Sequence, residues 1–176
     1  MEKRVIKHRH RHDPSKSLVG FIVGDVHYAV AIARVKEIAN ALEVVPLPHS
    51  PREVVGVADY RGEVVPVIDL RTRFGLPAAD RTRKSKWIVV DVAGRAAALI
   101  VDAVTDVFGT GGTELRPTPL LGGGDDLRGI AGVTNHGGAL VFVLDTSRMR
   151  DLTDPLVAQG RIGPAAASIM PRGNAT

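Results

Sequence analysis

The sequence predicts a mainly β protein, and three observations lead to this fold class. Its apolar residues gather in runs of about four to eight residues, rich in valine and bounded by Gly, Pro, Asp and Asn, which is typical of strands. Helical periodicity is brief wherever it occurs. Parts of the pattern also recur later in the chain, which predicts two similar small sheets or barrels that pack together.

The elements follow in chain order from this pattern. Six apolar runs have the length and composition of strands. They are Val19–Val23, Tyr28–Ile32, Val64–Leu70, Trp87–Val92, Ala96–Val101 and Leu140–Leu144. Three stretches instead have the apolar spacing of short helices. These are Ile32–Ala41, Leu70–Phe74 and Thr146–Leu152.

An internal repeat joins these elements. Residues 29–38 resemble residues 98–107 at an offset of 69 residues, with apolar aligned to apolar and acidic to acidic positions. A glycine followed seven residues later by an aspartate also occurs twice, as Gly62 with Asp69 and as Gly138 with Asp145. We expect each glycine in a hairpin turn with positive φ, and each aspartate at a strand end or helix N-cap. Chance similarity between valine-rich strands remains the alternative to a true duplication.

Composition and charge limit the class of protein further. The chain contains no cysteine, which excludes disulfides, thiol nucleophiles and thiolate metal sites. Six lysines and arginines against two acidic residues in residues 1–17 account for the formal net charge of +4 of the whole chain. The remainder is close to neutral and poor in aromatic residues, so it offers no basic face or stacking platform for nucleic acid.

These features divide the chain into one domain with two tails. Residues 1–17 are expected to form a disordered basic tail, because a charged block with few apolar residues cannot offset the entropy of ordering. Residues 18–152 form the predicted β domain, and residues 153–176 are expected to form a flexible C-terminal tail. No apolar run reaches the roughly 18 residues of a membrane span, and no secretory signal is visible, so a cytoplasmic protein is predicted.

No constellation of residues in the sequence predicts catalysis. The histidines outside the basic tail, His27, His49 and His136, are widely separated and lie beside turn residues. The two repeated aspartates suit helix capping better than they suit an acid pair. The glycine-rich stretches 109–112 and 122–126 lack the lysine and helix start of a phosphate-binding loop. We therefore expect no enzymatic activity, no catalytic residue, no metal site and no cofactor.

Binding fits the residues better than catalysis does. Tyr60 and Arg61 precede Gly62 in a predicted turn, where both side chains should be exposed. Arginine is enriched among the anchors of protein interfaces, although a turn arginine is usually solvated or caps a carbonyl. Both interpretations of Arg61 stay open at this point.

An ordered set of motifs from Leu18 to Leu152 resembles the CheW family of chemotaxis coupling proteins. The motifs are Phe21–Asp25, Tyr28–Val30, Val35–Ile38, Pro46–Pro48, Gly56–Arg71, Val101–Val104, Asp106–Val107, Gly129–Gly132 and Leu140–Asp145. The resemblance implies two interlocked five-stranded SH3-like barrels around a shared core, and no enzymatic activity. It implies an adaptor between the cytoplasmic tips of methyl-accepting chemoreceptors and the regulatory domain of a CheA-type histidine kinase, in arrays at the inner membrane. Other CheW-like proteins are further candidate partners.

The resemblance also implies two sets of contact residues. The receptor-binding set is Val35, Glu37, Ile38, Arg61, Val101 and Val104. The kinase-binding set, on the first barrel, is Val44, Val45, Leu47, Val64, Val65 and Val67. The family usually has Asn-Leu before Arg-Gly, whereas this chain has Asp59 and Tyr60. Asp59 could hold the Arg61 guanidinium in an intramolecular pair, which would favour a different receptor.

Two other functions compete with the adaptor. The basic tail could bind nucleic acid or an anionic membrane surface, in which case the affinity should fall steeply with salt. A groove anchored by apolar contacts should respond little to salt. An unrecognised small hydrolase is the third hypothesis, and an activity assay separates it from the other two.

Overall fold

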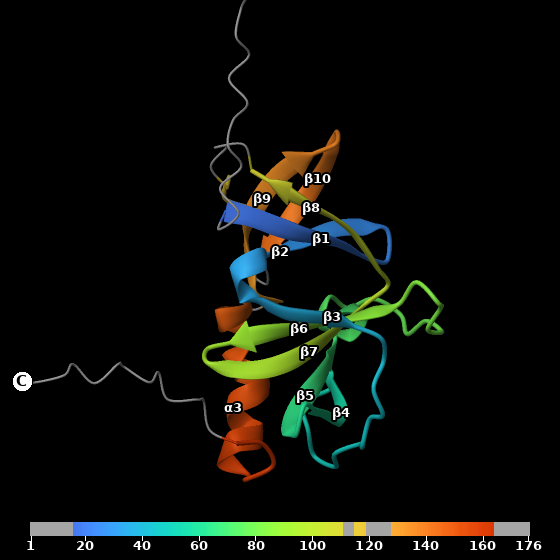
Figure 1. Cartoon of the computed structure of the whole chain (residues 1–176), viewed down its shortest axis with the longest axis vertical. Helices are drawn as coiled ribbons and strands as arrows, with labels where there is room; N and C mark the ends of the chain where they lie inside the picture. Colours follow the sequence, from blue (N-terminus) through green and yellow to red (C-terminus); the bar gives the residue numbers. More distant parts are fainter. Residues whose placement is uncertain (1–15, 111–114, 119–127, 164–176) are drawn as a thin grey trace, which may run out of the picture.

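The computed structural model describes residues 16–110, 115–118 and 128–163. Within these residues ten strands form two five-stranded sheets (Figure 1), which confirms the mainly β class. Barrel A contains β1 (Ser17–Val23), β2 (Val26–Ala31), β8 (Ala103–Gly109), β9 (Ile130–His136) and β10 (Ala139–Leu144). Barrel B contains β3 (Val35–Ala39), β4 (Val54–Tyr60), β5 (Glu63–Asp69), β6 (Lys86–Val92) and β7 (Arg95–Val101). The helical elements are η2 (Ile32–Arg34), α1 (Leu70–Arg73), η3 (Thr146–Met149) and α3 (Arg150–Ala158).

Each barrel is assembled from both halves of the chain. The strand order is β8-β1-β2-β10-β9 in barrel A and β3-β6-β7-β5-β4 in barrel B. When β1 to β5 are taken as one repeat and β6 to β10 as the next, the two orders match strand for strand. The first two strands of each repeat lie in one barrel and its last three lie in the other. The expected pair of interlocked five-stranded barrels is therefore confirmed.

The hairpin turns of the repeat have the geometry that their glycines predict. Gly62, with φ of 82°, lies between β4 and β5, and Gly138, with φ of 80°, lies between β9 and β10. Glycine adopts such angles without the strain that a Cβ brings. The predicted positive φ values are confirmed at both positions.

Aspartates begin the helical turn after the last strand of each repeat. Asp69 Oδ1 accepts a hydrogen bond from the backbone N of Arg71 at 2.8 Å. Asp145 Oδ1 accepts one from the backbone N of Ser147 at 3.0 Å. Each bond satisfies an N–H group that has no partner within its own helix, which confirms the predicted capping role.

Two further glycines allow a close approach of chain segments, one in each barrel. The segment at Val45 forms an isolated bridge to β4, and a Cβ on Gly56 would overlap the carbonyl oxygen of Val45. The segment at Arg116 forms the same kind of bridge to β9, and a Cβ on Gly132 would lie 2.8 Å from the carbonyl oxygen of Arg116. The same constraint at equivalent positions supports a true duplication.

Apolar clusters hold the two barrels together. The largest cluster contains side chains of both barrels, α1 and α3, with Phe21, Ile68 and Leu156 completely buried. Barrel B has an interior cluster around Trp87, and barrel A has a smaller one around Phe108. Because apolar burial is the main favourable term in folding, the shared cluster makes the two barrels one folding unit.

A charged contact reinforces the junction between the barrels. Asp102, between β7 and β8, accepts a hydrogen bond on Oδ2 from the backbone N of Gly24 at 2.6 Å. The same oxygen accepts a hydrogen bond from Nη1 of Arg71 at 2.5 Å. Gly24 lies in the first hairpin of barrel A, and Arg71 lies in α1, directly after a strand of barrel B. One carboxylate thus connects the two barrels.

The predicted helix over Ile32–Ala41 is wrong. The chain makes the single turn η2 and continues as β3, where Ile38 lies opposite Ile88 of β6. Lys36 and Ile38 are exposed while the residues between and beside them are half buried, which is the two-residue period of a strand. In so short a segment both periods fit the sequence, and pairing with β6 decides the outcome.

The predicted boundary at residue 152 is also too early. Helix α3 continues to Ala158 and buries Leu156, and Ile162 is buried in the shared cluster. At the other end Ser17, placed in the tail by the sequence, is the first residue of β1. The remaining tail predictions, for residues 1–15 and 164–176, lie outside the described residues.

Candidate functional site

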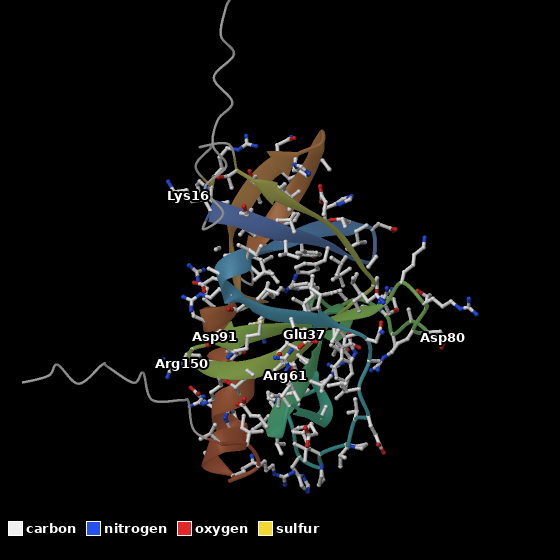
Figure 2. The ribbon with its side chains drawn as sticks, viewed as in Figure 1. Lys16, Glu37, Arg61, Asp80, Asp91 and Arg150 are labelled. Atoms are coloured by element: carbon white, nitrogen blue, oxygen red, sulfur yellow. The ribbon has the colours of Figure 1, made fainter. Side chains whose placement is uncertain are left out.

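Side chains around Glu37 join the two edge strands of barrel B. Glu37 lies on β3, and Tyr60 is the last residue of β4. Tyr60 Oη donates a hydrogen bond to Glu37 Oε2 at 2.9 Å, and Arg61 Nη2 donates to the same oxygen at 2.7 Å. The Arg61 guanidinium carbon lies 5.4 Å from the centre of the Tyr60 ring, within reach of a cation–π interaction. We call these three residues the Glu37 cluster; Figure 2 labels Glu37 and Arg61.

The backbone of Arg61 is left-handed. Its φ is 54°, and Gly62 follows with φ of 82°, so both central residues of this two-residue hairpin have positive φ, as in a type I′ turn. Asn, Asp or Gly usually fills the first position, because other residues are strained there by about 1 kcal/mol or more. The Arg61 side chain is nevertheless 73% exposed. A strained backbone that presents an exposed charge favours the interface interpretation of Arg61.

The expected pairing of Asp59 with Arg61 is wrong. Asp59 Oδ1 accepts a hydrogen bond from the backbone N of Gly62 at 2.8 Å, which fixes the turn. Successive side chains of a strand point to opposite faces, and Arg61 lies with Tyr60 on the face of Glu37. The guanidinium therefore pairs with a carboxylate from another strand.

Tyr60 acts as a hydrogen-bond donor over a wide pH range. Burial raises the pKa of Tyr60 above its ordinary value, and the hydrogen bond to Glu37 acts in the same direction, because both favour the neutral phenol. The positive charge of Arg61 opposes them. The Tyr60 ring also packs against the interior cluster of barrel B, so the hydroxyl is anchored where Glu37 can accept from it.

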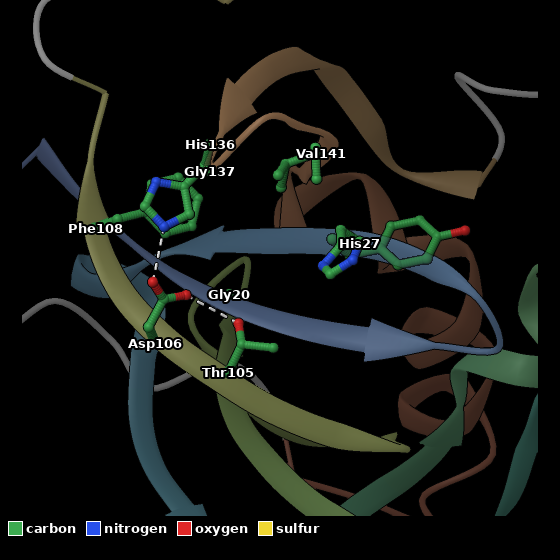
Figure 3. Close-up of a pocket in the computed structure, with 10 residues that line it drawn as sticks. Gly20, His27, Thr105, Asp106, Phe108, His136, Gly137 and Val141 are labelled. Atoms are coloured by element: carbon green, nitrogen blue, oxygen red, sulfur yellow. Dashed lines mark hydrogen bonds and ion pairs between the residues drawn. The ribbon is translucent and has the colours of Figure 1, made fainter.

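A side-chain contact also joins the two edge strands of barrel A, at the equivalent positions of the repeat. We call such a contact between edge strands the closure of a barrel. Asp106 on β8 corresponds to Glu37, and His136 at the end of β9 corresponds to Tyr60. His136 Nε2 and Asp106 Oδ2 are 2.7 Å apart, and the imidazole stacks on the Phe108 ring with centroids 3.8 Å apart (Figure 3). In both barrels an acidic residue on one edge strand thus meets a ring from the other edge strand.

The two closures differ in the turn that follows the ring. Barrel A continues with Gly137 and Gly138, whose φ values are 59° and 80°. Barrel B has Arg61 and Gly62 in these places. The closure of barrel A is therefore made without any counterpart of Arg61.

A cavity of about 310 Å³ lies inside barrel A beside its closure. His27 and Val141 lie across this space from Asp106 in Figure 3, and Gly20 of β1 also lines it. Barrel B has the buried Val89 at the position of Gly20. In barrel A the position next to Gly20 is instead occupied by Thr105, whose Oγ1 would lie 2.5 Å from an added Cβ.

Replacing Asp106 with asparagine is expected to reduce the acid sensitivity of the fold. The hydrogen bond from His136 lowers the pKa of Asp106 below its ordinary value, Thr105 adds to this, and burial opposes it. A carboxyl whose pKa falls on folding stabilises the protein above its unfolded pKa, and this contribution is lost as the pH falls through the folded pKa. Urea unfolding of wild type and Asp106→Asn between about pH 5 and pH 2 measures the difference.

Asp80→Asn is the control for this prediction, because Asp80 is exposed and the described residues record no ion pair for it. Its loss of stability on acidification should match that of wild type. If Asp106→Asn loses as much stability as wild type over the same range, the pair with His136 contributes nothing to the folded state.

The structure separates the predicted receptor-binding residues into three groups. Ile38 is 43% exposed and follows Glu37 on the edge strand β3, so its side chain points to the opposite face of the strand from Glu37. Val35 and Val104 are partly buried and pack against the shared apolar cluster. Val101 is only 1% exposed in that cluster, so the prediction of a contact at Val101 is corrected. It ends β7, an inner strand whose apolar side chains are buried on both faces.

The predicted kinase-binding residues also divide by burial. Val45 and Val64 are exposed, Val44 and Leu47 are half buried, and Val65 and Val67 are completely buried. The predictions for Val65 and Val67 are corrected, because both side chains fill the interior of barrel B. Val64 points the opposite way from its neighbour, as alternation along a strand requires.

The contacts that organise the site are not evident in the sequence. The sequence predicts Tyr60 and Arg61 as exposed turn residues but gives no connection between them and Glu37, which precedes Tyr60 by 23 residues. His136 stands in the sequence only as a histidine beside a turn. One signal was available, because the repeat aligns Glu37 with Asp106. An acidic residue at the same place in two apolar strands indicates a shared structural role.

The Glu37 cluster offers a guanidinium, a carboxylate and an aromatic ring, which suits docking of a protein surface. Among the described residues, no three His, Asp or Glu side chains come together as a metal site. In the described parts of the chain, residues 16–110, 115–118 and 128–163, none of the helices has the length and apolar character of a membrane span.

Comparison with known protein families identifies this architecture. The family model of the CheW-like domain matches residues 17–153. The chain belongs to the CheW-like domain family. The match begins at the first residue of β1 and ends inside α3, so it covers both barrels. The predicted resemblance is thereby confirmed.

Known CheW proteins are similar to this CheW-like chain in sequence and in structure. The chemotaxis protein CheW of Rhizobium meliloti is 37% identical over 111 residues, 63% of this chain and 72% of that protein. The chemotaxis protein CheW of Helicobacter pylori is 34% identical over 101 residues, 57% of this chain and 61% of that protein. The crystal structure of the scaffolding protein TtCheW from Thermoanaerobacter tengcongensis superposes with a TM-score of 0.68 at 27% identity, covering 74% of this chain and 89% of that one.

These comparisons support the function of a chemotaxis coupling adaptor for this CheW-like chain. They give no support to the alternative of a nucleic-acid or anionic-membrane binder that works through the basic tail. The residues of that tail before Lys16 lie outside the described part of the chain.

Proposed function

We propose that this CheW-like chain is a non-enzymatic adaptor that binds the cytoplasmic tip of a methyl-accepting chemoreceptor and the regulatory domain of a CheA-type histidine kinase. The complex is proposed to act in the cytoplasm, in arrays at the inner membrane, where other CheW-like proteins are candidate neighbours. The observation that carries the receptor part is the Glu37 cluster, which holds an exposed arginine in a left-handed turn.

The comparison of the two barrels supports a binding role for Arg61. Barrel A closes with an acidic residue and a ring alone, and its turn uses glycine where barrel B uses Arg61. Arg61 is therefore not needed to close a barrel of this kind, and its backbone conformation costs stability. A residue that the fold does without and that strains the turn is best explained by a partner.

The kinase part of the proposal rests on exposed apolar side chains of barrel B. Val45 and Val64 are 58% and 47% exposed, and the segment that carries Val45 is bridged to β4, next to the strand of Val64. Exposed apolar side chains on neighbouring segments of one barrel favour an interaction surface there. The proposed kinase-binding set is thus Val44, Val45, Leu47 and Val64.

Substitution of Val64 by aspartate is expected to weaken kinase binding about tenfold or more, because a charge would be buried at the interface. Titration calorimetry of the chain against the regulatory domain of the CheA-type kinase encoded in the same genome measures this. The matched control is Leu140→Asp, because Leu140 holds the equivalent position in barrel A and is 46% exposed.

Three results would contradict the proposal. The absence of any binding by wild type at tens of micromolar would remove the kinase as a partner. Equal weakening by both variants would mean that the surface is not confined to barrel B. Weakening by Leu140→Asp alone would move the kinase surface to barrel A. Melting temperatures of both variants close to that of wild type would show that each acts on binding and not on folding.

A further inference from the structure

We propose that Tyr60 is a positioning residue that determines which receptor tips this chain accepts, because it holds Glu37 and Arg61 together as one pre-formed pair. The inference rests on the proposed function of the same surface. It concerns a residue that the family resemblance does not assign, since the family usually has leucine at this position. The partner that fits is a receptor segment with an acidic side chain for Arg61.

The geometry gives Tyr60 two separate contacts with the pair. Its hydroxyl donates to Glu37 Oε2, the same oxygen that receives Nη2 of Arg61, at 2.9 Å and 2.7 Å respectively. Its ring lies beneath the guanidinium at 5.4 Å. The ring itself is packed against the interior of barrel B, so it cannot follow the motion of the exposed arginine. A leucine at this position would provide neither the hydroxyl nor the aromatic face.

Arg61 keeps hydrogen-bond donors that a partner could bind. The hydrogen bond and ion pair recorded for Arg61 within the described residues both use Nη2, which leaves Nη1 and Nε for a carboxylate from outside. Guanidinium and carboxylate groups bind most strongly when the planar donor is already oriented. By fixing that plane before binding, Tyr60 reduces the entropy that the complex must otherwise lose.

The same arrangement penalises a wrong partner. A receptor tip without an acidic residue opposite Arg61 would cover the guanidinium and leave its remaining donors without acceptors, which is costly. A mobile arginine could turn away into water and avoid this loss. A fixed one cannot, so Tyr60 increases the difference in affinity between the two classes of receptor tip.

Barrel A provides a matched control for the experiment. His136 occupies the place of Tyr60 and contacts Asp106, but the next residue is Gly137 and no arginine is present. Removing the hydrogen bond of His136 disturbs an equivalent barrel closure without touching the proposed pair. An effect of closure alone should therefore appear equally in His136→Phe and in Tyr60→Phe.

The binding experiment uses the full chain and cytoplasmic tips of chemoreceptors from the same genome, chosen with and without an acidic residue in the docking segment. Wild type, Tyr60→Phe, Tyr60→Leu and His136→Phe are compared by titration calorimetry. We expect Tyr60→Phe to lower the affinity for acidic tips about three- to tenfold, the size of one ordinary hydrogen bond, because the bond acts on binding only through the position of Arg61. Tyr60→Leu should lower it further and bring the two classes of tip closer together, while His136→Phe should leave both affinities unchanged.

A spectroscopic measurement separates positioning from a general effect on the fold. In wild type the Nε–H signal of the Arg61 guanidinium should be visible and distinct in nitrogen-15 NMR spectra, because the group is held. It should move into the averaged arginine signal in Tyr60→Phe and stay in place in His136→Phe. In a Glu37→Gln background, Tyr60→Phe should have no further effect on affinity, since the shared acceptor has already been weakened.

The outcomes distinguish this inference from the proposed function. If wild type binds no receptor tip, the proposed function fails and this inference fails with it. If wild type binds but Tyr60→Phe and Tyr60→Leu bind and discriminate equally well, the inference alone is overturned. An Arg61 signal that does not change in Tyr60→Phe, or a loss of binding that is equally large in His136→Phe, also overturns it.

Discussion

Replacing Gly56 with alanine is expected to lower the free energy of unfolding by about 3 kcal/mol, the combined size of backbone strain and overpacking. Gly56 has φ of 155°, and an added Cβ would overlap the Val45 carbonyl oxygen and lie 2.7 Å from Cγ1 of Val44. The carbonyl belongs to a backbone that is hydrogen-bonded to β4 in both directions, so it cannot shift without loss of the bridge. Urea unfolding at neutral pH measures the effect.

Gly62→Ala is the control for steric overlap. Gly62 also has positive φ, but an added Cβ there would meet no atom within 4 Å, so only backbone strain of about 1 kcal/mol is expected. A similar loss for both variants would mean that the bridge at Val45 moves away freely. A loss at Gly56 that is clearly larger than at Gly62 is the expected result.

Replacing Arg61 with asparagine is expected to lower receptor affinity by about 2 kcal/mol or more, roughly thirtyfold, while the protein becomes no less stable. Asn-Gly is a favoured pair for a type I′ turn, so the substitution relieves the left-handed strain at φ of 54°. The ion pair with Glu37 that is lost is largely exposed, and such pairs contribute only about 0 to 1 kcal/mol. Binding and stability should therefore change independently.

Arg150→Asn is a suitable control, because Arg150 is another exposed, ion-paired arginine and lies on α3. It should leave receptor affinity as in wild type. Calorimetry with the receptor tip and thermal melting of both variants give the two readouts. If Arg61→Asn binds the receptor as tightly as wild type, Arg61 is not the anchor, and the strain at this turn has some other cause.

The inner strands of the fold could be predicted from the sequence, and the edge strands could not. The six predicted runs correspond to β1, β2 and β10 of barrel A and to β5, β6 and β7 of barrel B. The four strands that were missed, β3, β4, β8 and β9, are the edges of the two sheets. Inner strands are buried on both faces and appear as apolar runs. Edge strands carry charges such as Glu37 and Asp106, or glycines such as Gly56, which interrupt that signal.

The candidate site was predictable in its location but not in its contacts. Resemblance to the family led to Glu37 and Arg61, which meet where the two edge strands of barrel B come together, and to Ile38, the next residue on β3. It could not exclude Val65, Val67 or Val101, because alternation along a strand gives the face of a residue only after the register is known. The contact of Tyr60 with Glu37 depends on two edge strands meeting, and a side-chain contact between distant segments leaves no local pattern.

The exchange of strands between the two repeats has a consequence for how the chain reaches its native state. As the protein is synthesised, β1 and β2 emerge first but pair with β8 and β10, which belong to the second half of the chain. Most contacts are therefore long-range in sequence, as in slow-folding all-β proteins. Neither half can complete a barrel alone, so a nascent or truncated chain exposes unpaired edges that are prone to aggregate. Barrel B consists of β3 to β7 and can therefore pair its strands once β7 has been made, whereas barrel A and the shared apolar cluster are expected to be completed only after β10 has left the ribosome.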